Sequence, residues 1–212
     1  MFASSQSASE IEALCAKAAR GAGMEWGVAE EAGRAAQWLY TIGLNGPAAL
    51  LRLLDRHSKT GQLAVAGKDL LAADGGDLSP IDVGTALSDF ANIDQGSKQI
   101  SQVLAPLLLL PFVHQIARAE NRAYELEWRQ GKMFVHPNGT CSGMVRQLEN
   151  THACRIAMNP TEGISSPALQ SAQRPLLAAD MIARLNMYAM RTTVPATAAS
   201  RANAGSGATD ND

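Results

Sequence analysis

The sequence has no excess of positive charge, and this absence limits the partners that it can bind. Lys and Arg total 18 against 20 Asp and Glu, which gives a formal net charge of −2. Proteins that bind nucleic acids gain affinity by neutralising phosphates with clustered Lys and Arg. No such cluster is present in the sequence. We therefore expect no nucleic-acid partner.

Long apolar runs are also absent. The longest run covers residues 103–113, contains two prolines, and is far shorter than the ~20 residues that span a bilayer. The first sixteen residues hold no Lys or Arg and lead into no apolar run, unlike a secretory signal. Cysteine is scarce, and the three that occur form no Cys-x-x-Cys pair, which fits reduced thiols. We expect a cytoplasmic protein with no membrane partner.

The common cofactor-binding motifs are missing. Neither the phosphate-binding loop G-x-x-x-x-G-K-[ST] nor the hydrolase elbow G-x-S-x-G occurs in the sequence. Gly21-x-Gly23 matches the start of a dinucleotide-binding motif, but it follows a predicted helix, and Trp26 replaces the third glycine. Two glycines at that point are typical of the end of a helix. We therefore expect no cofactor.

Four residue types that bind zinc lie within a short segment, namely His136, Cys141, His152 and Cys154. Their spacing matches no zinc finger or knuckle. Cys141 and Cys154 fit buried positions on strands equally well, because free cysteine is among the most buried residue types. We predict no metal site, and the sequence leaves open whether the four side chains come together.

The composition is that of a globular protein. The chain has 212 residues, of which 46% are hydrophobic and 18% charged. A chain of this length can bury a substantial core. We predict a single globular domain over residues 1–195. A tail rich in Gly, Ala and Ser follows over residues 196–212, either docked on the domain or solvated.

The strongest local pattern covers residues 9–44. Ser9 and Glu12 have the spacing of a capping box, so we predict that a helix begins there. Gly21 predicts its end, and a second helix is predicted over residues 28–42. Both helices are rich in alanine, which favours a closely packed antiparallel hairpin. The predicted contact residues are Ala18, Ala32, Gly33 and Ala35.

Less regular patterns follow. Pro47 predicts the first turn of a third helix, and Ser79 predicts the cap of a fourth. Residues 62–78 predict a long connection with one helical turn near residues 68–73. Residues 107–110 lie between two prolines and predict a short buried strand, with a single kinked helix as the alternative.

Alternating residues indicate strands after residue 123. Tyr124, Leu126 and Trp128 would face the core, opposite a charged side, and Gln130-Gly131 predicts a hairpin turn. Further strands of a meander are predicted over residues 140–148 and 154–158, followed by a helix over residues 175–191. Helices, then a mostly antiparallel sheet, then a long C-terminal helix indicate an α+β fold.

Two segments contain groups suited to binding an anion. Lys17 and Arg20 lie on the last predicted turn of the first helix, close to Trp26. The tail contributes a hydroxyl, a guanidinium and the main-chain amides of small residues, which together are typical of an anion-binding loop. These tail residues are Ser200, Arg201, Gly205 and Gly207. We expect the tail to fold back so that its groups lie beside Lys17, Arg20 and Trp26.

Three stretches of the sequence resemble a known family. They are E-I-E-A-L-C-A-K-A-A-R-G-A-G-M-E-W-G-V-A-E-E-A-G-R-A-A-Q-W-L over residues 10–39, P-L-L-L-L-P-F over residues 106–112, and R-T-T-V-P-A-T-A-A-S-R-A-N-A-G-S-G-A-T-D-N-D over residues 191–212. On these, the chain resembles the bacterial family known as domain of unknown function 3726. The resemblance implies an ordered Gly/Ala-rich ending in T-D-N-D, and it implies no particular activity.

These observations lead to two functional hypotheses. The first is a protein that binds a small anionic metabolite between the N-terminal helical hairpin and the C-terminal tail, with or without a reaction on it. The alternative is a non-catalytic accessory protein that pairs through its alanine-rich helical face, with an enzyme or with itself as a homo-oligomer. The sequence identifies no catalytic residue.

Overall fold

The computed structural model describes residues 6–91, 96–162 and 173–192. The residues from 193 onward, including the predicted anion-binding tail, lie outside this part of the chain. The described helices are α1 (Ala8–Gly21), α2 (Trp26–Thr41), α3 (Gly46–Leu54), α4 (Pro80–Phe90), α5 (Leu110–Ala119), α6 (Val145–Glu149) and α7 (Ala179–Ala189). Short 3-10 turns cover His57–Lys59, Pro106–Leu109 and Met190–Thr192.

The strands form one sheet of seven. They are β1 (Leu63–Ala66), β2 (Asp69–Ala72), β3 (Lys98–Leu104), β4 (Ala123–Trp128), β5 (Gly131–Val135), β6 (Cys141–Gly143) and β7 (Ala153–Thr161). Their order in the sheet is β1-β2-β3-β7-β4-β5-β6. Only the β2–β3 pair is parallel, so this sheet of described strands is mostly antiparallel. The predicted α+β fold is confirmed.

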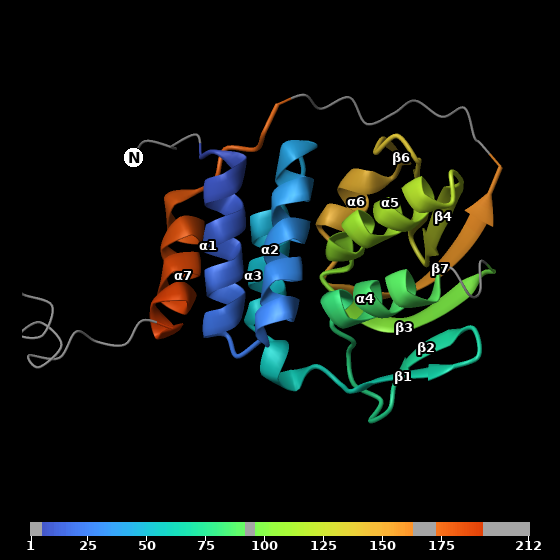
Figure 1. Cartoon of the computed structure of the whole chain (residues 1–212), viewed down its shortest axis with the longest axis horizontal. Coiled ribbons are helices and arrows are strands. Elements are labelled where there is room, and N and C mark those ends of the chain that lie inside the picture. The colour runs from blue at the N-terminus through green and yellow to red at the C-terminus, as the bar shows by residue number, and fades with distance from the viewer. Residues whose placement is uncertain (1–5, 92–95, 163–172, 193–212) are drawn as a thin grey trace, which may run out of the picture.

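The helices separate into two groups (Figure 1). Helices α7, α1, α2 and α3 stand side by side at one end of the molecule, while α4, α5 and α6 lie between them and the sheet. No helix in the described ranges combines the length and the apolar character needed to cross a membrane.

Both helices of the N-terminal hairpin begin two residues earlier than predicted. The capping box of α1 uses Ser7 and Glu10: the Glu10 amide donates to the Ser7 hydroxyl at 3.2 Å, and the Ser7 amide donates to the Glu10 carboxylate at 2.8 Å. The same Ser-x-x-Glu spacing occurs at Ser9, which instead lies inside the helix. The earlier start wins because it adds main-chain hydrogen bonds to the helix. Helix α2 begins at Trp26, after Glu25 in an extended conformation.

The predicted close packing of α1 and α2 is confirmed. Gly23 has a φ of 100°, and the amides of Gly23 and Met24 donate to the carbonyls of Arg20 and Ala19, which ends α1 and reverses the chain. A Cβ on Gly33 would lie 2.8 Å from the Cβ of Ala16. The predicted contact residues Ala18, Ala32, Gly33 and Ala35 are all buried.

Two predictions for the middle of the chain are wrong. Residues 68–73 form no helical turn, because β1 and β2 pair as a hairpin around Gly67, whose φ of 61° suits the turn. Residues 107–110 are not a strand; they form a 3-10 turn that leads into α5, as in the alternative of a continuous helical segment. Pro111 lies in the first turn of α5, where a missing N–H breaks no helical hydrogen bond.

The strand predictions are confirmed in part. Trp128 and Leu126 are buried and Glu127 is exposed, as expected, but the turn consists of Arg129-Gln130, because Gly131 already pairs with Trp128. The third strand stops at Gly143 and the chain continues into α6, where Val145 and Leu148 are buried at helical spacing. The predicted meander is confirmed for β4, β5 and β6, but the fourth strand does not continue it, because β7 inserts between β3 and β4. The last described helix, α7, begins at Ala179, and Ala178 before it has an extended backbone conformation.

Candidate functional site

A groove of about 840 Å³ lies where α1 ends, α2 begins and α7 ends. Basic, aromatic and thioether side chains all line it. The lining residues are Lys17, Arg20, Gly23, Glu25, Trp26, Ala189, Met190, Arg191 and Thr192. The groove therefore forms only because α7 packs beside the hairpin of α1 and α2.

Helix α7 is held there by contacts at both sides. A Cβ on Gly21 would collide with the main-chain carbonyl of Tyr188, so α7 can approach α1 only where the side chain is absent. Leu185, a residue of α7, is fully buried. Asp55, after the end of α3, accepts hydrogen bonds from Arg184 at 2.6 Å and from the Tyr188 hydroxyl at 3.0 Å.

Arg20 and Trp26 form the centre of the groove. The Arg20 guanidinium donates to the main-chain oxygen of Met24 at 2.6 Å, and its Cζ lies 5.1 Å from the centre of the Trp26 ring. This distance is typical of a cation–π contact. Trp26 is nevertheless 67% exposed, so most of the indole remains available to a ligand.

The groove has an excess of positive charge. Lys17 and Arg20 come from α1, and Arg191 comes from the 3-10 turn after α7, where its guanidinium lies 4.4 Å from the centre of the Tyr188 ring. Glu25 is the one carboxylate among the lining residues. Three cations against one carboxylate give a formal charge of about +2, which favours anions.

The start of α2 adds to this preference. Glu25 is the N-cap of this helix of 16 residues, and its side chain makes no capping hydrogen bond. The first amides of a helix have no partner within the helix and lie at the positive end of its dipole. A smaller cavity of about 90 Å³ adjoins the groove and shares Lys17, Arg20, Trp26 and Thr192 with it.

The structure brings Lys17, Arg20 and Trp26 together, as the sequence predicted. Ser200, Arg201, Gly205 and Gly207 lie outside the described residues. The sequence reasoning missed Met190 and Arg191. In the sequence they are recognisable only as residues at the end of an amphipathic helix. That pattern does not predict which other helix lies beside them.

The four zinc-type residues do not form a centre. Across the described part of the chain, no three His, Cys, Asp or Glu side chains are placed to share a metal ion. His136 instead lies 3.1 Å from the Ser142 hydroxyl. Burial raises the pKa of Cys141 to about 12 and that of Cys154 to about 11, so both are protonated core thiols. His152 is exposed.

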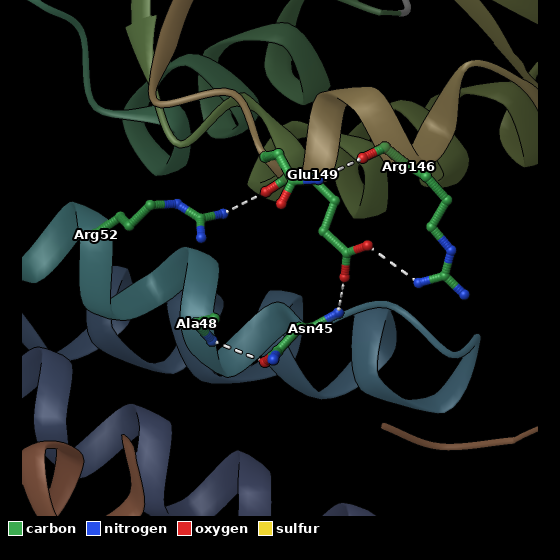
Figure 2. A network of polar contacts seen from close by, with 6 residues as sticks. Asn45, Ala48, Arg52, Arg146 and Glu149 are labelled. Carbon is green, nitrogen blue, oxygen red and sulfur yellow. Dashed lines mark hydrogen bonds and ion pairs between the residues drawn. The ribbon is translucent and has the colours of Figure 1, made fainter. Parts of the chain in front are cut away.

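A separate polar network ties the helical end to the sheet end (Figure 2). Glu149 in α6 accepts from the Asn45 amide at 2.6 Å and pairs with Arg146 at 3.0 Å. Its main-chain oxygen accepts from Arg52 at 2.8 Å. Burial lowers the pKa of Arg52, although the Glu149 carboxylate opposes this. Asn45 also caps α3 through the Ala48 amide. This network joins α3 to α6 and belongs to the architecture.

A comparison with protein families identifies part of the chain. Residues 6–96 match the family described as protein of unknown function (DUF3726). The predicted resemblance to this family is thereby confirmed for residues 6–96, which include the first of the three stretches. The DUF3726 segment contains α1 to α4, and hence Lys17, Arg20 and Trp26, whereas α7 lies beyond it. No curated protein matches the chain.

Proposed function

We propose that the protein binds a small anionic metabolite in the groove between α1, α2 and α7, in the cytoplasm of a bacterial cell. The observation that carries this proposal is the convergence of Lys17, Arg20 and Arg191 around the exposed ring of Trp26. Lysine and arginine recognise carboxylates and phosphates through charge-assisted hydrogen bonds.

The other lining residues indicate what the anion carries. The Trp26 ring and the exposed thioether of Met190 offer apolar surface beside the cations. Flat apolar groups pack well on such surfaces, and thioethers adapt to their shape. The volume of about 840 Å³ lies in the range of small-molecule pockets. We infer a carboxylate or phosphate joined to a carbon skeleton that contacts Trp26.

The C-terminal tail would complete this site. Thr192 is the last residue of the described chain and lines the groove, so the residues that follow it start there. We propose that Ser200, Arg201 and the amides of Gly205 and Gly207 fold back onto the same anion.

The proposal specifies binding and leaves the reaction undefined. Among the lining residues of the groove there is no histidine or cysteine, and Glu25 is the only carboxylate. Lys17 and Thr192 carry groups that can act as nucleophiles, but among the described residues neither is hydrogen-bonded to Glu25, and the Thr192 hydroxyl donates to the Ala189 carbonyl at 2.7 Å.

The alternative of pairing through an alanine-rich helical face receives less support. Most alanines within α1 and α2 pack inside the same chain, whereas Ala13 is exposed and Ala16 is partly buried. The alanines that are at most 2% exposed are Ala18, Ala19, Ala29, Ala32, Ala35 and Ala36. Self-association through another surface stays a prediction.

Calorimetric titration at low salt tests the proposal. The ligands are inorganic phosphate, a phosphomonoester, an aliphatic carboxylate and an aromatic carboxylate. At least one should bind, and Arg20→Met should weaken it about tenfold or more, because a charge-assisted hydrogen bond contributes about 1.5–3 kcal/mol. Arg129→Met, which removes an exposed arginine from the β4–β5 turn, is the matched control and should leave the affinity unchanged.

Two results would contradict the proposal. One is that no anion of the panel binds to the full chain. The other is that Arg20→Met and Arg129→Met change the affinity equally, since the effect would then come from overall charge and not from the groove. Circular dichroism of both variants checks that each retains the helical content of the unmodified protein.

A further inference from the structure

A second cavity, of about 260 Å³, lies between α1, α2 and α5. It shares no lining residue with the anion groove. Its lining includes Arg34, Ala35, Pro111 and Phe112, together with two carboxylates, two amides and the rings of a tryptophan and a histidine. The carboxylates, amides and these two rings belong to Glu12, Glu31, Gln37, Trp38, His114 and Gln115.

A pair of stacked rings forms one wall. The rings of Trp38 and His114 have centroids 5.2 Å apart and planes inclined by 22°. Burial lowers the pKa of His114, the main chain of His136 opposes this, and Arg118 lowers the pKa further. The ring is therefore neutral near pH 7. Its Nδ1 is buried and has no hydrogen-bond partner among the described residues.

The two carboxylates of the lining differ in how closely a positive charge approaches them. Arg34, also in the lining, lies 2.7 Å from a Glu31 oxygen and 3.9 Å from a Glu30 oxygen. The charge of the Glu31 carboxylate is therefore already compensated within α2. The Glu12 side chain makes no hydrogen bond or ion pair with the described part of the chain, although its charge helps to raise the pKa of Arg34. Two carboxylates and one guanidinium leave the lining with a formal charge of about −1, which favours a cation.

We propose that this cavity binds a small organic ammonium compound. The Glu12 carboxylate holds the ammonium group, and the carbon skeleton lies against Trp38. A cation close to an indole is attracted by the ring as well as by the carboxylates. The volume is slightly below that of ordinary ligand pockets, about 300–1,000 Å³, which restricts the ligand to a small amine.

The site joins two parts of the chain. Glu12 and Glu31 lie in the DUF3726 segment, whereas His114 and Gln115 lie in α5 beyond it. An amine bound between them would contact both the helical hairpin and the layer that covers the sheet. Binding would therefore stabilise the packing of α2 against α5.

Calorimetric titration of the full chain with benzylammonium chloride tests this inference. Benzyl alcohol, which has nearly the same shape and no charge, and benzoate, of opposite charge, are the control ligands. We expect benzylammonium to bind at least about tenfold more tightly than either, because a charge-assisted hydrogen bond to a carboxylate is worth about that factor.

Matched variants locate the binding. Glu12→Gln should weaken benzylammonium binding about tenfold or more, since it removes the charge and keeps the size. Glu127→Gln removes an exposed carboxylate from β4 and should change nothing. Arg20→Met should also change nothing, so a failure of this inference is distinguishable from a failure of the anion groove.

Three results would overturn the inference. The first is that benzylammonium does not bind the full chain. The second is that benzyl alcohol binds as tightly as benzylammonium, which would mean that the carboxylates have no role. The third is that Glu12→Gln and Glu127→Gln have equal effects, which would place the binding elsewhere on the surface.

Discussion

Gly21 of α1 lies directly against the main-chain carbonyl of Tyr188 in α7, with no room for a side chain between them. The 3-10 turn that follows α7 supplies Met190 and Arg191 to the anion groove. The smallest residue of α1 thus sets the distance between the two walls of that groove. Gly21 is a positioning residue for a site that it does not line.

Replacing Gly21 with alanine should therefore lower stability and weaken anion binding together. The added methyl group forces α7 away from α1, and overpacking of this kind costs about 1–3 kcal/mol. Urea unfolding measures the loss. Gly27→Ala in α2 is the matched control, since its Cβ would meet nothing within 4 Å. Equal effects of the two variants would show that α7 does not pack as described.

Ala35 tests the packing of the N-terminal hairpin. It is 2% exposed and also borders the cavity of about 260 Å³, so Ala35→Leu adds three carbon atoms at a buried position and should cost about 1–3 kcal/mol. Ala13→Leu makes the same change at an exposed position of α1 and should leave the thermal midpoint almost unaltered. An unchanged midpoint for Ala35→Leu would mean that the hairpin is looser than the structure has it.

Glu149 tests the junction between α3 and α6. Glu149→Ala leaves the amide of Asn45 without its acceptor, and an unsatisfied, part-buried donor costs about 1–3 kcal/mol. Glu149→Gln keeps an oxygen for that amide and loses mainly the half-exposed Arg146 pair, which is worth about 0–1 kcal/mol. The alanine variant should unfold at clearly lower urea concentration. If both variants lose the same stability, the ion pair is the stronger contact.

His114 should make the stability depend on pH. Because its pKa is lowered in the folded state, the unfolded chain binds the proton more tightly, and folding stability is lost as the pH falls below the ordinary value of about 6.5. His114→Phe keeps a ring beside Trp38 and removes the titration. Subtracting the variant's unfolding free energy from that of the unmodified protein should give a difference that falls between about pH 7.5 and pH 5.5. A constant difference would contradict the burial of the ring.

Truncation after Val194 tests the contribution of the tail. A docked tail that makes two or three charge-assisted hydrogen bonds would add several kcal/mol, at about 1.5–3 kcal/mol each. The truncated chain should then melt at a lower temperature and bind its anion more weakly. Should it melt at the same temperature and keep the anion, Arg201 and its neighbours do not belong to the site.

Local chemistry explains which parts of the fold were predictable. The cap at Ser79, the turn at Gly23 and the alternation through Leu126 depend on near neighbours in sequence, and all were predicted correctly. The hairpin of β1 and β2 was missed, because its short strands show no regular alternation and its pairing with β3 is not local. Residues 107–110 are apolar on all sides, a pattern that fits a buried strand and a buried helix equally well.

The same distinction applies to the candidate sites. The last turns of α1 contain Lys17 and Arg20, and α2 begins at Trp26. The sequence alone therefore predicts that these three residues lie close together. Arg191 joins them only because Gly21 admits α7. Trp38 and His114 stack across two helices that are far apart in the chain, and no spacing rule relates them. Tertiary contacts of this kind cannot be read from periodicity.

The position of β7 determines the order in which the sheet can assemble. It is the last of the described strands along the chain, yet it pairs with both β3 and β4 near the middle of the sheet. A growing chain therefore holds two separate β-hairpins, β1–β2 and β4–β5, whose halves of the sheet cannot join until β7 has been synthesised. Such non-local pairing slows folding and leaves strand edges open to other chains in the meantime. The sheet therefore becomes continuous only after a strand that lies well beyond the DUF3726 segment has been synthesised.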